Sequence, residues 1–415
     1  MTTITTSSPQ QAQAFLDRYH AVEEFLNANC VERKDDIELL LLSMIAGVDL
    51  LLLGDPGVGK TYMIELVTDH CIVGADLFTH LCAKDQSVGE ILGERDVNAL
   101  KQGITARVML GMLPQANFAY LDEIFKSSPP MLNPMLDIFA KRQLKVGGKV
   151  IDCGQLVTIF MSSNELPDRE DLMAFRDRIA ITKFVEAVKS PEGRRRVSEL
   201  QLGQAVNGID TNGLDPFTLD EITAMREQAK MIAVPDGIID IMGEIEQQCL
   251  EARHPISQRR KRDIWRMVKA KAWARGGDTV RADDFMVAQH MLWNLASDAA
   301  SSHDIVLKHA NTFVRKAAAI EAELEPIMAE MDKLKEQIET ATTRDQKLDL
   351  QQSGYHFIRD LQDVVDKAKG YIKQGQHEGQ DINDLRDALQ KVQKAQKWTT
   401  AQLTGVDDDD EEDDD

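Results

Sequence analysis

Short apolar runs alternate with longer stretches of helical periodicity in the first half of the chain. The runs are VDLLLLG at 48–54, LFTHLC at 77–82, NFAYLDEIF at 117–125 and LVTIFMSSN at 156–164. Each has the length of a buried strand, and helical patterns separate them. Strands that alternate with helices predict an α/β fold with a parallel, helix-covered sheet.

This α/β block is predicted to cover residues 30–197, with a helix that begins near Val31. It follows an N-terminal extension, residues 1–29, whose first 20 residues are polar and expected to be loose. The glycine- and asparagine-rich stretch QLGQAVNGIDTNGLDP predicts a linker at 198–216. A second, helical block then covers residues 217–298, and Thr218 with Glu221 fits a capping box at its start.

The last part of the chain carries a heptad pattern. Apolar residues recur at a spacing of four and three residues: Ile320, Leu324, Ile327, Met331, Leu334 and Ile338. Weaker stripes follow, so residues 299–400 predict a helical hairpin, or coiled coil, with a third short helix that pairs within the chain. Pro326 lies inside the first stripe and is expected to kink or restart that helix.

The charge balance narrows the classes of partner. The formal net charge is −21, and the nine residues Asp407–Asp415 are all acidic. Residues 401–415 therefore predict a disordered acidic tail, which either solubilises the chain or docks on a basic partner. The remaining acidic body argues against a broad nucleic-acid footprint but leaves room for a local basic pore.

Compartment and metal signals are weak. The five cysteines form no CxxC pair and the histidines form no ligand motif, so we expect neither disulfides nor a structural metal site. No apolar run reaches the roughly 18 residues of a membrane span, and the first residues do not resemble a secretory signal. These features favour a cytoplasmic protein.

The clearest chemical motif follows the first apolar run. It matches the phosphate-loop pattern G-x-x-x-x-G-K-[ST] from Gly54, and its remaining residues are Asp55, Pro56, Gly57, Val58, Gly59, Lys60 and Thr61. Backbone N–H groups of such a loop wrap phosphates, and the following helix N-terminus adds partial positive charge. Lys60 is predicted to reach the β- and γ-phosphates and Thr61 to hold Mg²⁺. The loop alone does not distinguish ATP from GTP.

Two further runs end in polar residues. Asp122 and Glu123 follow an apolar strand, which would deliver both carboxylates to the edge of the sheet where ligands bind. Asp122 is predicted to bind Mg²⁺, and Glu123 to polarise the attacking water as a general base. Asn164 could hold the water or the γ-phosphate. The alternatives are a solvated strand end for the carboxylates and a turn residue for Asn164.

The order of these motifs resembles that of an AAA+ ATPase. Phosphate loop, "DE" strand, "SSNE" strand, AFRDRI and a helical region with ISQRR follow in that sequence. LDEIFKSSPPMLNPMLDIFAKRQLKVGG and IFMSSNELPD resemble the MoxR family, the RavA-like group in particular, over residues 30–295. The resemblance implies an ATP- and Mg²⁺-dependent AAA+ core at 30–197 and an α-helical lid at 217–298. The region beyond residue 300 resembles no family that we recognise.

Family roles can be carried to matching residues. Asn164 would be the sensor at the fourth core strand. Arg178 would be the arginine finger that reaches a neighbouring subunit's γ-phosphate, with Arg176 as its competitor. Arg259 would be the sensor arginine of the lid, although the adjacent Arg260 leaves the register open. A finger that acts in trans requires an oligomer, and the family implies a ring of six subunits.

Two insertions are predicted to face the central pore or ring surface. They are KDQSVGEILGERDVNALKQG and KRQLKVGGKVIDC, and the second predicts a β-hairpin with Gly147 and Gly148 at its turn. Their basic residues could make that face basic or could be ordinary solvated loop charges: Lys101, Arg107, Lys141, Arg142, Lys145 and Lys149.

Three functions remain at this point. The first is a MoxR-type ATPase, chaperone-like in action, that remodels or activates a protein partner, such as one with a von Willebrand factor A domain. The second is a nucleic-acid motor, which the acidic body disfavours. The third is a nucleotide-switched scaffold assembled through the C-terminal helices.

Overall fold

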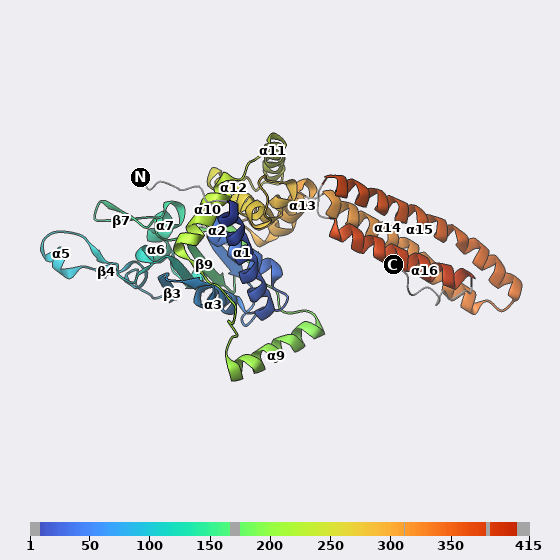
Figure 1. Ribbon diagram of the computed structural model, residues 1–415, viewed down its shortest axis with the longest axis horizontal. Coiled ribbons are helices and arrows are strands. Elements are labelled where there is room, and N and C mark those ends of the chain that lie inside the picture. The colour runs from blue at the N-terminus through green and yellow to red at the C-terminus, as the bar shows by residue number, and fades with distance from the viewer. Residues whose placement is uncertain (1–8, 167–174, 311, 379–381, 405–415) are drawn as a thin grey trace. The chain divides into compact units, whose positions relative to one another are not determined.

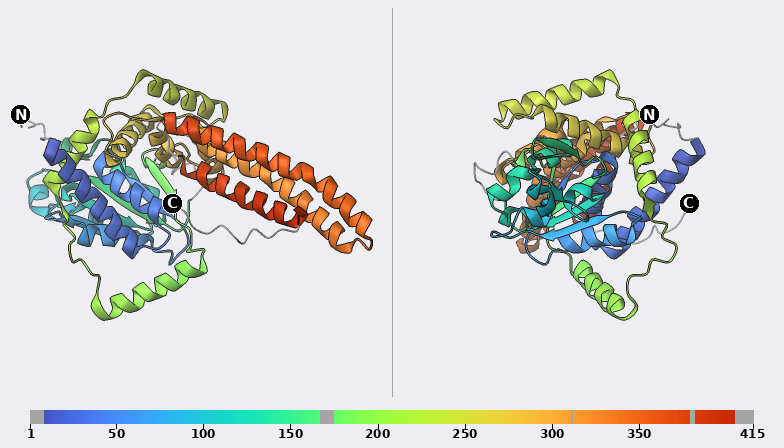
Figure 2. Two further views of the ribbon diagram at one scale, coloured as in Figure 1. Left: turned by 45° about the vertical axis from the view of Figure 1, so that its right-hand side comes forward. Right: turned by 90° about the vertical axis from the view of Figure 1, so that its left-hand side faces the viewer.

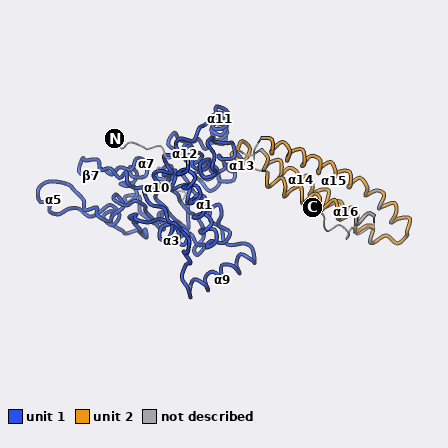
Figure 3. The backbone as a smooth tube through the Cα atoms, in the orientation of Figure 1, with its two compact units in different colours: residues 1–305 blue, residues 306–415 orange. Residues whose placement is uncertain are grey.

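The computed structural model describes residues 9–166, 175–310, 312–378 and 382–404. The chain forms two compact units, residues 1–305 and 306–415 (Figures 1 and 3). The predicted acidic tail falls almost wholly outside the described residues. Within the described ranges, no helix combines the length and the apolarity needed to cross a membrane.

Unit 1 is built on a parallel five-stranded sheet in the order β10-β1-β9-β6-β3. The strands are β1 (Leu50–Leu53), β3 (Leu77–Leu81), β6 (Phe118–Asp122), β9 (Thr158–Ser163) and β10 (Ile181–Phe184). Every residue of β1 and β9 is buried, as expected for strands covered on both faces. The predicted parallel sheet is confirmed. Strand β10 was not predicted, because its short edge sequence ITKF includes two polar residues.

Helices α2 (Lys34–Ala46) and α3 (Lys60–His70) pack on the sheet, and α1 (Pro9–Asn29) packs on both of these helices. The expectation that residues 1–20 are loose is wrong from residue 9 onward, because Tyr19, Val22 and Leu26 are buried on one face of α1. Helix α2 begins three residues later than predicted. Glu32 has a φ of 56°, a left-handed conformation that an α-helix cannot contain.

The predicted insertions form an arm and a hairpin. The arm comprises α4 (Gly89–Leu92), β4 (Glu94–Arg95), α5 (Val97–Lys101) and β5 (Arg107–Val108). The hairpin is confirmed as β7 (Gln143–Val146) and β8 (Lys149–Asp152), with positive φ at Gly147 and Gly148. A Cβ on Gly147 would lie 2.6 Å from the carbonyl oxygen of Thr105, so the hairpin turn packs closely on the arm.

Short elements complete the α/β part. Between β5 and β7 lie η1 (Leu113–Gln115), η2 (Ile124–Lys126), α6 (Pro129–Leu132), η3 (Asn133–Met135) and α7 (Leu136–Lys141). β2 (Ile72–Val73) pairs in parallel with β11 (Phe217–Thr218), which leads into the helical region.

The remainder of unit 1 is mostly helical. Its elements are α9 (Pro191–Asn207), α10 (Leu219–Met231), α11 (Asp236–Glu251), α12 (Gln258–Ala274), η4 (Ala282–His290) and η5 (Ala296–Asp298). Helix α9 extends into the stretch predicted as a linker, and it stands away from the sheet in every view (Figures 1 and 2). The capping box of Thr218 and Glu221 is confirmed, and α12 packs against α2, α10 and η4.

Helix α13 (Ala299–Ala310) precedes the long helices of unit 2, α14 (Thr312–Thr340), α15 (Arg344–Glu378) and α16 (Asn383–Thr404). These three helices pack on one another around buried residues that include Ile320, Leu361 and Leu385. The predicted pairing within the chain is therefore observed. Helix α14 continues through Pro326 and does not restart there. Because Pro326 is exposed, water can satisfy the backbone carbonyl that proline, which has no N–H, leaves without a helical hydrogen bond.

Candidate active site

The phosphate loop connects the carboxyl end of β1 to the N-terminus of α3. Gly54 packs so closely against β10 that a Cβ there would lie 2.4 Å from the carbonyl oxygen of Val185. Gly59 has a φ of 94°, which side chains larger than hydrogen strongly disfavour. These two glycines allow the loop to turn tightly and to start the helix at Lys60.

Lys60 lies at the mouth of this loop with three acceptors. Its ammonium group donates to the carbonyl oxygens of Gly54 (2.6 Å) and Asp55 (3.0 Å) and to Oδ1 of Asn164 (2.7 Å). Burial lowers the pKa of Lys60, while the carboxylates of Glu123, Asp122 and Asp55 oppose that shift. The side chain is thus held where the sequence predicts phosphate binding.

Asn164 bridges Lys60 to Glu123. Its amide oxygen accepts from Lys60, and its amide nitrogen donates to Oε1 of Glu123. Glu123 is 8% exposed and has a left-handed backbone, with φ 54°. Its Oε2 is buried and makes no hydrogen bond to any described residue, while Lys126 lies 3.6 Å from Oε1. The structure therefore brings together the three residues predicted to bind and activate the nucleotide.

A chain of hydroxyl groups links Thr61 to Asp122. The Thr61 hydroxyl lies 2.9 Å from that of Tyr120, which lies 3.0 Å from the hydroxyl of Ser162. Ser162 donates to Oδ1 of Asp122. Burial raises the pKa of Tyr120 to about 12, so its phenol stays protonated. The sequence analysis did not identify Tyr120 and Ser162, although Tyr120 and Asp122 are two residues apart and so lie on the same face of β6.

The donor set at this point suits Mg²⁺. Thr61 and Asp122, the predicted magnesium residues, present a hydroxyl and a carboxylate, and both are hard oxygen ligands. In the described part of the chain, no three His, Cys, Asp or Glu side chains gather as metal ligands. One or two protein oxygens are nevertheless enough for Mg²⁺ when substrate phosphates and water supply the rest.

The loop opens into a pocket of about 1040 Å³. Besides the residues above, its wall includes Arg33 from the start of α2 and Arg194, Leu200 and Gln204 from α9. Arg33 is 7% exposed and donates to the carbonyl oxygen of Val58 (2.9 Å), inside the loop. Its role was not predicted, because no local pattern relates it to a loop 25 residues away.

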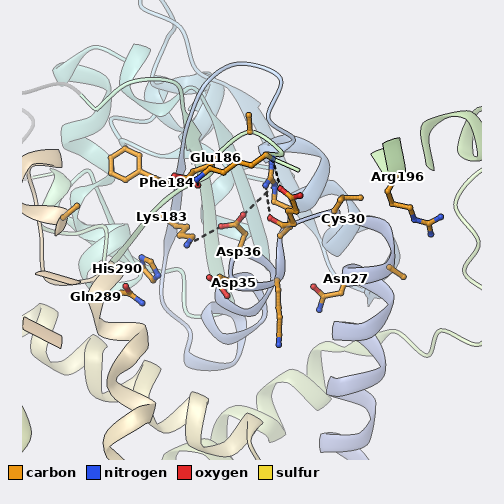
Figure 4. Close-up of a pocket in the computed structure, with 18 of the residues that line it drawn as sticks. Asn27, Cys30, Asp35, Asp36, Lys183, Phe184, Glu186, Arg196, Gln289 and His290 are labelled. Carbon is orange, nitrogen blue, oxygen red and sulfur yellow. Dashed lines mark hydrogen bonds and ion pairs between the residues drawn. The ribbon is translucent and has the colours of Figure 1, made fainter. Parts of the chain in front are cut away.

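Figure 4 shows a second pocket, of about 820 Å³. Its wall shares Cys30, Val31 and Arg33 with the wall of the first pocket. Asp36 is buried in its wall, 3.8 Å from Arg33 and 3.8 Å from Lys183. Its Oδ1 makes no hydrogen bond to any described residue. Burial raises the pKa of Asp36 to about 6, although Lys183 and Arg33 favour the charged form.

The two candidate finger arginines differ in exposure. Arg176 is 5% exposed, whereas Arg178 is partly exposed and lines a separate pocket. That pocket lies at the amino end of the strands, opposite the phosphate loop, because Asp49, Val157 and Ala180 in its wall directly precede β1, β9 and β10.

The two candidate sensor arginines also differ. Arg260 is buried and donates to the carbonyl oxygens of Met291, Trp293, Arg176 and Ile179 at 3.0–3.3 Å. Burial lowers its pKa to about 10. Arg260 therefore connects the helical region to the segment 176–179, which contains both candidate finger arginines. Arg259 is more exposed and pairs with Asp177 (3.0 Å), next to Arg178, instead of lining the phosphate-loop pocket.

Two of the basic residues predicted for the insertions are paired with carboxylates. Arg142 pairs with the buried Asp49 (2.6 Å), and Lys145 pairs with Asp137 (2.8 Å). On the arm Lys101 is exposed, but so are the apolar side chains of Val97, Leu100, Ile104 and Val108. The basic residues of the insertions therefore give less support to a nucleic-acid motor than the sequence suggested.

Comparisons with known proteins agree with this geometry. A family model described as the MoxR domain in the MoxR-vWA-beta-propeller ternary systems matches residues 17–225, and an AAA lid domain matches residues 235–306. The uncharacterized proteins MJ0079 and MJ0812 of Methanocaldococcus jannaschii are 28% identical over 310 residues and 27% identical over 317 residues. Those alignments cover 74% and 75% of this chain and 79% and 81% of the relatives.

One solved structure shows the same fold. It is that of an ATPase candidate from Cytophaga hutchinsonii, with a TM-score of 0.59 and 16% identity. The match covers 73% of this chain and 97% of that one.

Proposed function

Because the chain belongs to the MoxR family of AAA+ ATPases, as its motifs predicted, we propose that it hydrolyses ATP as a ring and uses the resulting conformational change to remodel or activate a protein partner. The observation that carries this proposal is the hydrogen-bonded series Lys60, Asn164 and Glu123 at the end of the phosphate loop. The choice of ATP over GTP rests on the family. The proposed compartment is the cytoplasm.

The site residues have distinct tasks in this proposal. Lys60 holds the β- and γ-phosphates. Oε2 of Glu123, which is buried and makes no hydrogen bond to a described residue, accepts the proton of the attacking water. Asn164 ties these two residues together, so that the base and the phosphate-binding ammonium group keep a fixed separation. Thr61 and Asp122 would hold Mg²⁺, which offsets charge on the phosphates when bound.

The arginines point to a site completed by a second subunit. Arg178 lies at the amino end of the strands, and Arg259 pairs with the residue before it. The phosphate loop lies at the opposite end. We propose that both arginines act on the nucleotide of a neighbouring copy across a heterologous interface, in a ring of six. Each guanidinium would stabilise charge that develops on the γ-phosphate.

The proposed client is a protein. The matched family description mentions MoxR-vWA-beta-propeller systems, which supports a partner with a von Willebrand factor A domain. Helix α9 supplies part of the nucleotide pocket and stands away from the sheet (Figure 2), so nucleotide state can be communicated to the helical region.

The test uses Glu123→Gln, which should bind ATP but hydrolyse it slowly and so retain its partners. Lys60→Ala, which cannot hold the phosphates, is the control. ATP-loaded Glu123→Gln should capture a protein with a von Willebrand factor A domain from host extract, and the purified pair should dissociate when wild-type chain hydrolyses ATP. Capture of nuclease-sensitive nucleic acid in place of protein would contradict remodelling and favour the motor.

A further inference from the structure

The pocket at the amino end of the strands, called the basic pocket here, is unusual in an acidic chain. It has a volume of about 350 Å³. Besides Arg178, six basic side chains line it: Lys141, Arg142, Arg226, Lys230, Arg262 and Arg266. Its carboxylates are Asp49 and Asp263. Seven cations and two carboxylates therefore share one pocket, although the whole chain has a net charge of −21.

The two carboxylates are already engaged by some of these cations. Asp49 accepts two hydrogen bonds from Arg142, at 2.6 and 2.9 Å. Asp263 is shared by Arg262 (3.1 Å) and Arg266 (3.5 Å). Pairs such as these cancel at most part of the positive potential, because three arginines divide two carboxylates.

Arg226 adds partly buried positive charge. Its guanidinium donates to the carbonyl oxygens of Met44 (2.9 Å) and Ile45 (3.2 Å) at the C-terminus of α2. These carbonyls carry only the partial negative charge of a helix end. Burial, together with the nearby charges of Arg142 and Arg266, lowers the pKa of Arg226 to about 10. Lys230 pairs with Glu227 (2.6 Å), which does not line the pocket, so the excess positive charge of the pocket rests on Lys141 and the arginines.

The phosphate-loop pocket has the opposite balance. Its wall contains four carboxylates and three cations: Asp55, Glu65, Asp122 and Glu123 against Arg33, Lys60 and Arg194. Bound ATP adds about four negative charges, of which Mg²⁺ offsets about two. Because a heterologous ring places unlike surfaces together, the carboxyl end of one subunit's strands can meet the amino end of the next.

We infer that the basic pocket receives the triphosphate-loaded phosphate-loop face of a second copy of this chain, and that Arg262 and Arg266 are positioning residues for ATP hydrolysis in that copy. This inference rests on the proposed ring and adds residues beyond Arg178 and Arg259. Both arginines lie on α12, three and seven residues after Arg259, and so share one helix face with it. Their charge draws the neighbouring triphosphate toward Arg178, which lines the same pocket.

The experiment is a complementation of two variants with different defects. Arg262→Gln/Arg266→Gln keeps an intact phosphate loop, and its glutamines can still donate to Asp263. Lys60→Ala keeps an intact basic pocket but cannot hold phosphates. Each variant alone should turn over ATP at least about tenfold more slowly than wild type. An equal mixture should regain activity, since about a quarter of its heterologous interfaces pair an intact loop with an intact pocket.

Three controls separate this effect from simple misfolding. Arg195→Ser/Arg359→Ser removes the same charge from side chains that are 83% and 78% exposed, and it should leave turnover unchanged. Arg262→Lys/Arg266→Lys should retain most activity. Lys141→Gln, on another wall of the pocket, should raise the KM for ATP or lower kcat without any loss of stability.

Two results would overturn the inference. One is unchanged turnover in Arg262→Gln/Arg266→Gln, and the other is a defect that mixing with Lys60→Ala does not relieve, which would mean that the arginines act only within their own subunit. Arg178→Ala tests the proposed ring separately. If Arg178→Ala is complemented by Lys60→Ala while Arg262→Gln/Arg266→Gln is not, the ring stands and the role of the basic pocket fails. A wild-type chain that turns over no ATP would contradict both.

Discussion

The two ends of the strands in one sheet carry opposite chemistry. At the carboxyl end, four carboxylates surround the phosphate loop, and Oε2 of Glu123 and Oδ1 of Asp36 are buried without hydrogen bonds to described residues. At the amino end, seven cations line one pocket and Asp49 is fully engaged by Arg142 and by the amide of Ile159. The carboxyl end thus keeps carboxylate oxygens available as acceptors, whereas the amino end holds positively charged side chains in fixed positions. The carboxyl end supplies the proposed base, Glu123, and the amino end supplies the proposed arginine finger, Arg178.

The largest expected effect comes from removing the proposed arginine finger at the amino end while the carboxyl end stays intact. Arg178→Ala should lower ATP turnover by about a thousandfold or more, because a trans-acting arginine stabilises the transition-state charge. Nucleotide binding to the isolated subunit should be preserved, since Arg178 does not line the phosphate-loop pocket. Steady-state turnover and equilibrium binding of a fluorescent ATP analogue measure the two quantities. A parallel loss of both would mean that Arg178 acts within its own subunit.

The next effect isolates the base at the carboxyl end. Glu123→Gln should lower turnover by about a hundredfold to ten-thousandfold while it retains ATP binding, because the amide cannot accept a proton. Asn164→Ala should have a smaller effect, since it removes only the link between Lys60 and Glu123. Turnover in Glu123→Gln close to that of the wild type would exclude Glu123 as the general base.

The amino end predicts an effect on stability. Asp49→Ala leaves Arg142, whose side chain is only 18% exposed, without its carboxylate and should lower the free energy of unfolding by about 3–5 kcal/mol. Asp137→Ala is the matched control, because its partner Lys145 is 65% exposed and such pairs contribute under about 1 kcal/mol. Urea unfolding followed by circular dichroism would compare them. Equal losses would show that the Arg142–Asp49 pair has no special structural role.

The smallest effect concerns Asp36. Its pKa is about 6 in the folded chain and about 3.8 when unfolded, so the folded state keeps the proton to higher pH. Stability should therefore fall as pH rises from about 4 to about 6, by up to about 3 kcal/mol, and change little from this group above that range. Asp36→Asn should remove this dependence. Melting temperatures measured across the range should diverge, with the variant gaining relative to wild type as pH rises; parallel curves would contradict the assignment.

Local sequence patterns predicted the carboxyl end well. Lys60, Glu123 and Asn164 each follow an apolar run, and parallel strands bring such positions to the same edge. The chain of hydroxyl groups through Tyr120 and Ser162 could have been predicted in part, because Tyr120 and Asp122 lie two residues apart on the same face of one strand. The contact of Arg33 with Val58 could not have been predicted, since it depends on how the phosphate loop packs against the start of α2.

The amino end could not be predicted in the same way. The basic pocket draws residues from segments as distant as Asp49 and Arg266, and none of them forms a motif by itself. The sequence pattern grouped Arg142 with exposed insertion charges, but its pairing with Asp49 depends on tertiary packing across 93 residues. Strand β10 and helix α1 were missed because the first is short and partly polar and the second has only a sparse buried face.

A site shared between subunits is tested by ATP turnover per subunit as a function of subunit concentration, with Mg²⁺ and saturating ATP. A site assembled from the two ends of different copies predicts low specific activity in dilute solution, a steep rise as copies associate, and then a plateau. Arg178→Ala should stay low at every concentration. A specific activity that is already maximal in dilute, monomeric protein would contradict the shared site.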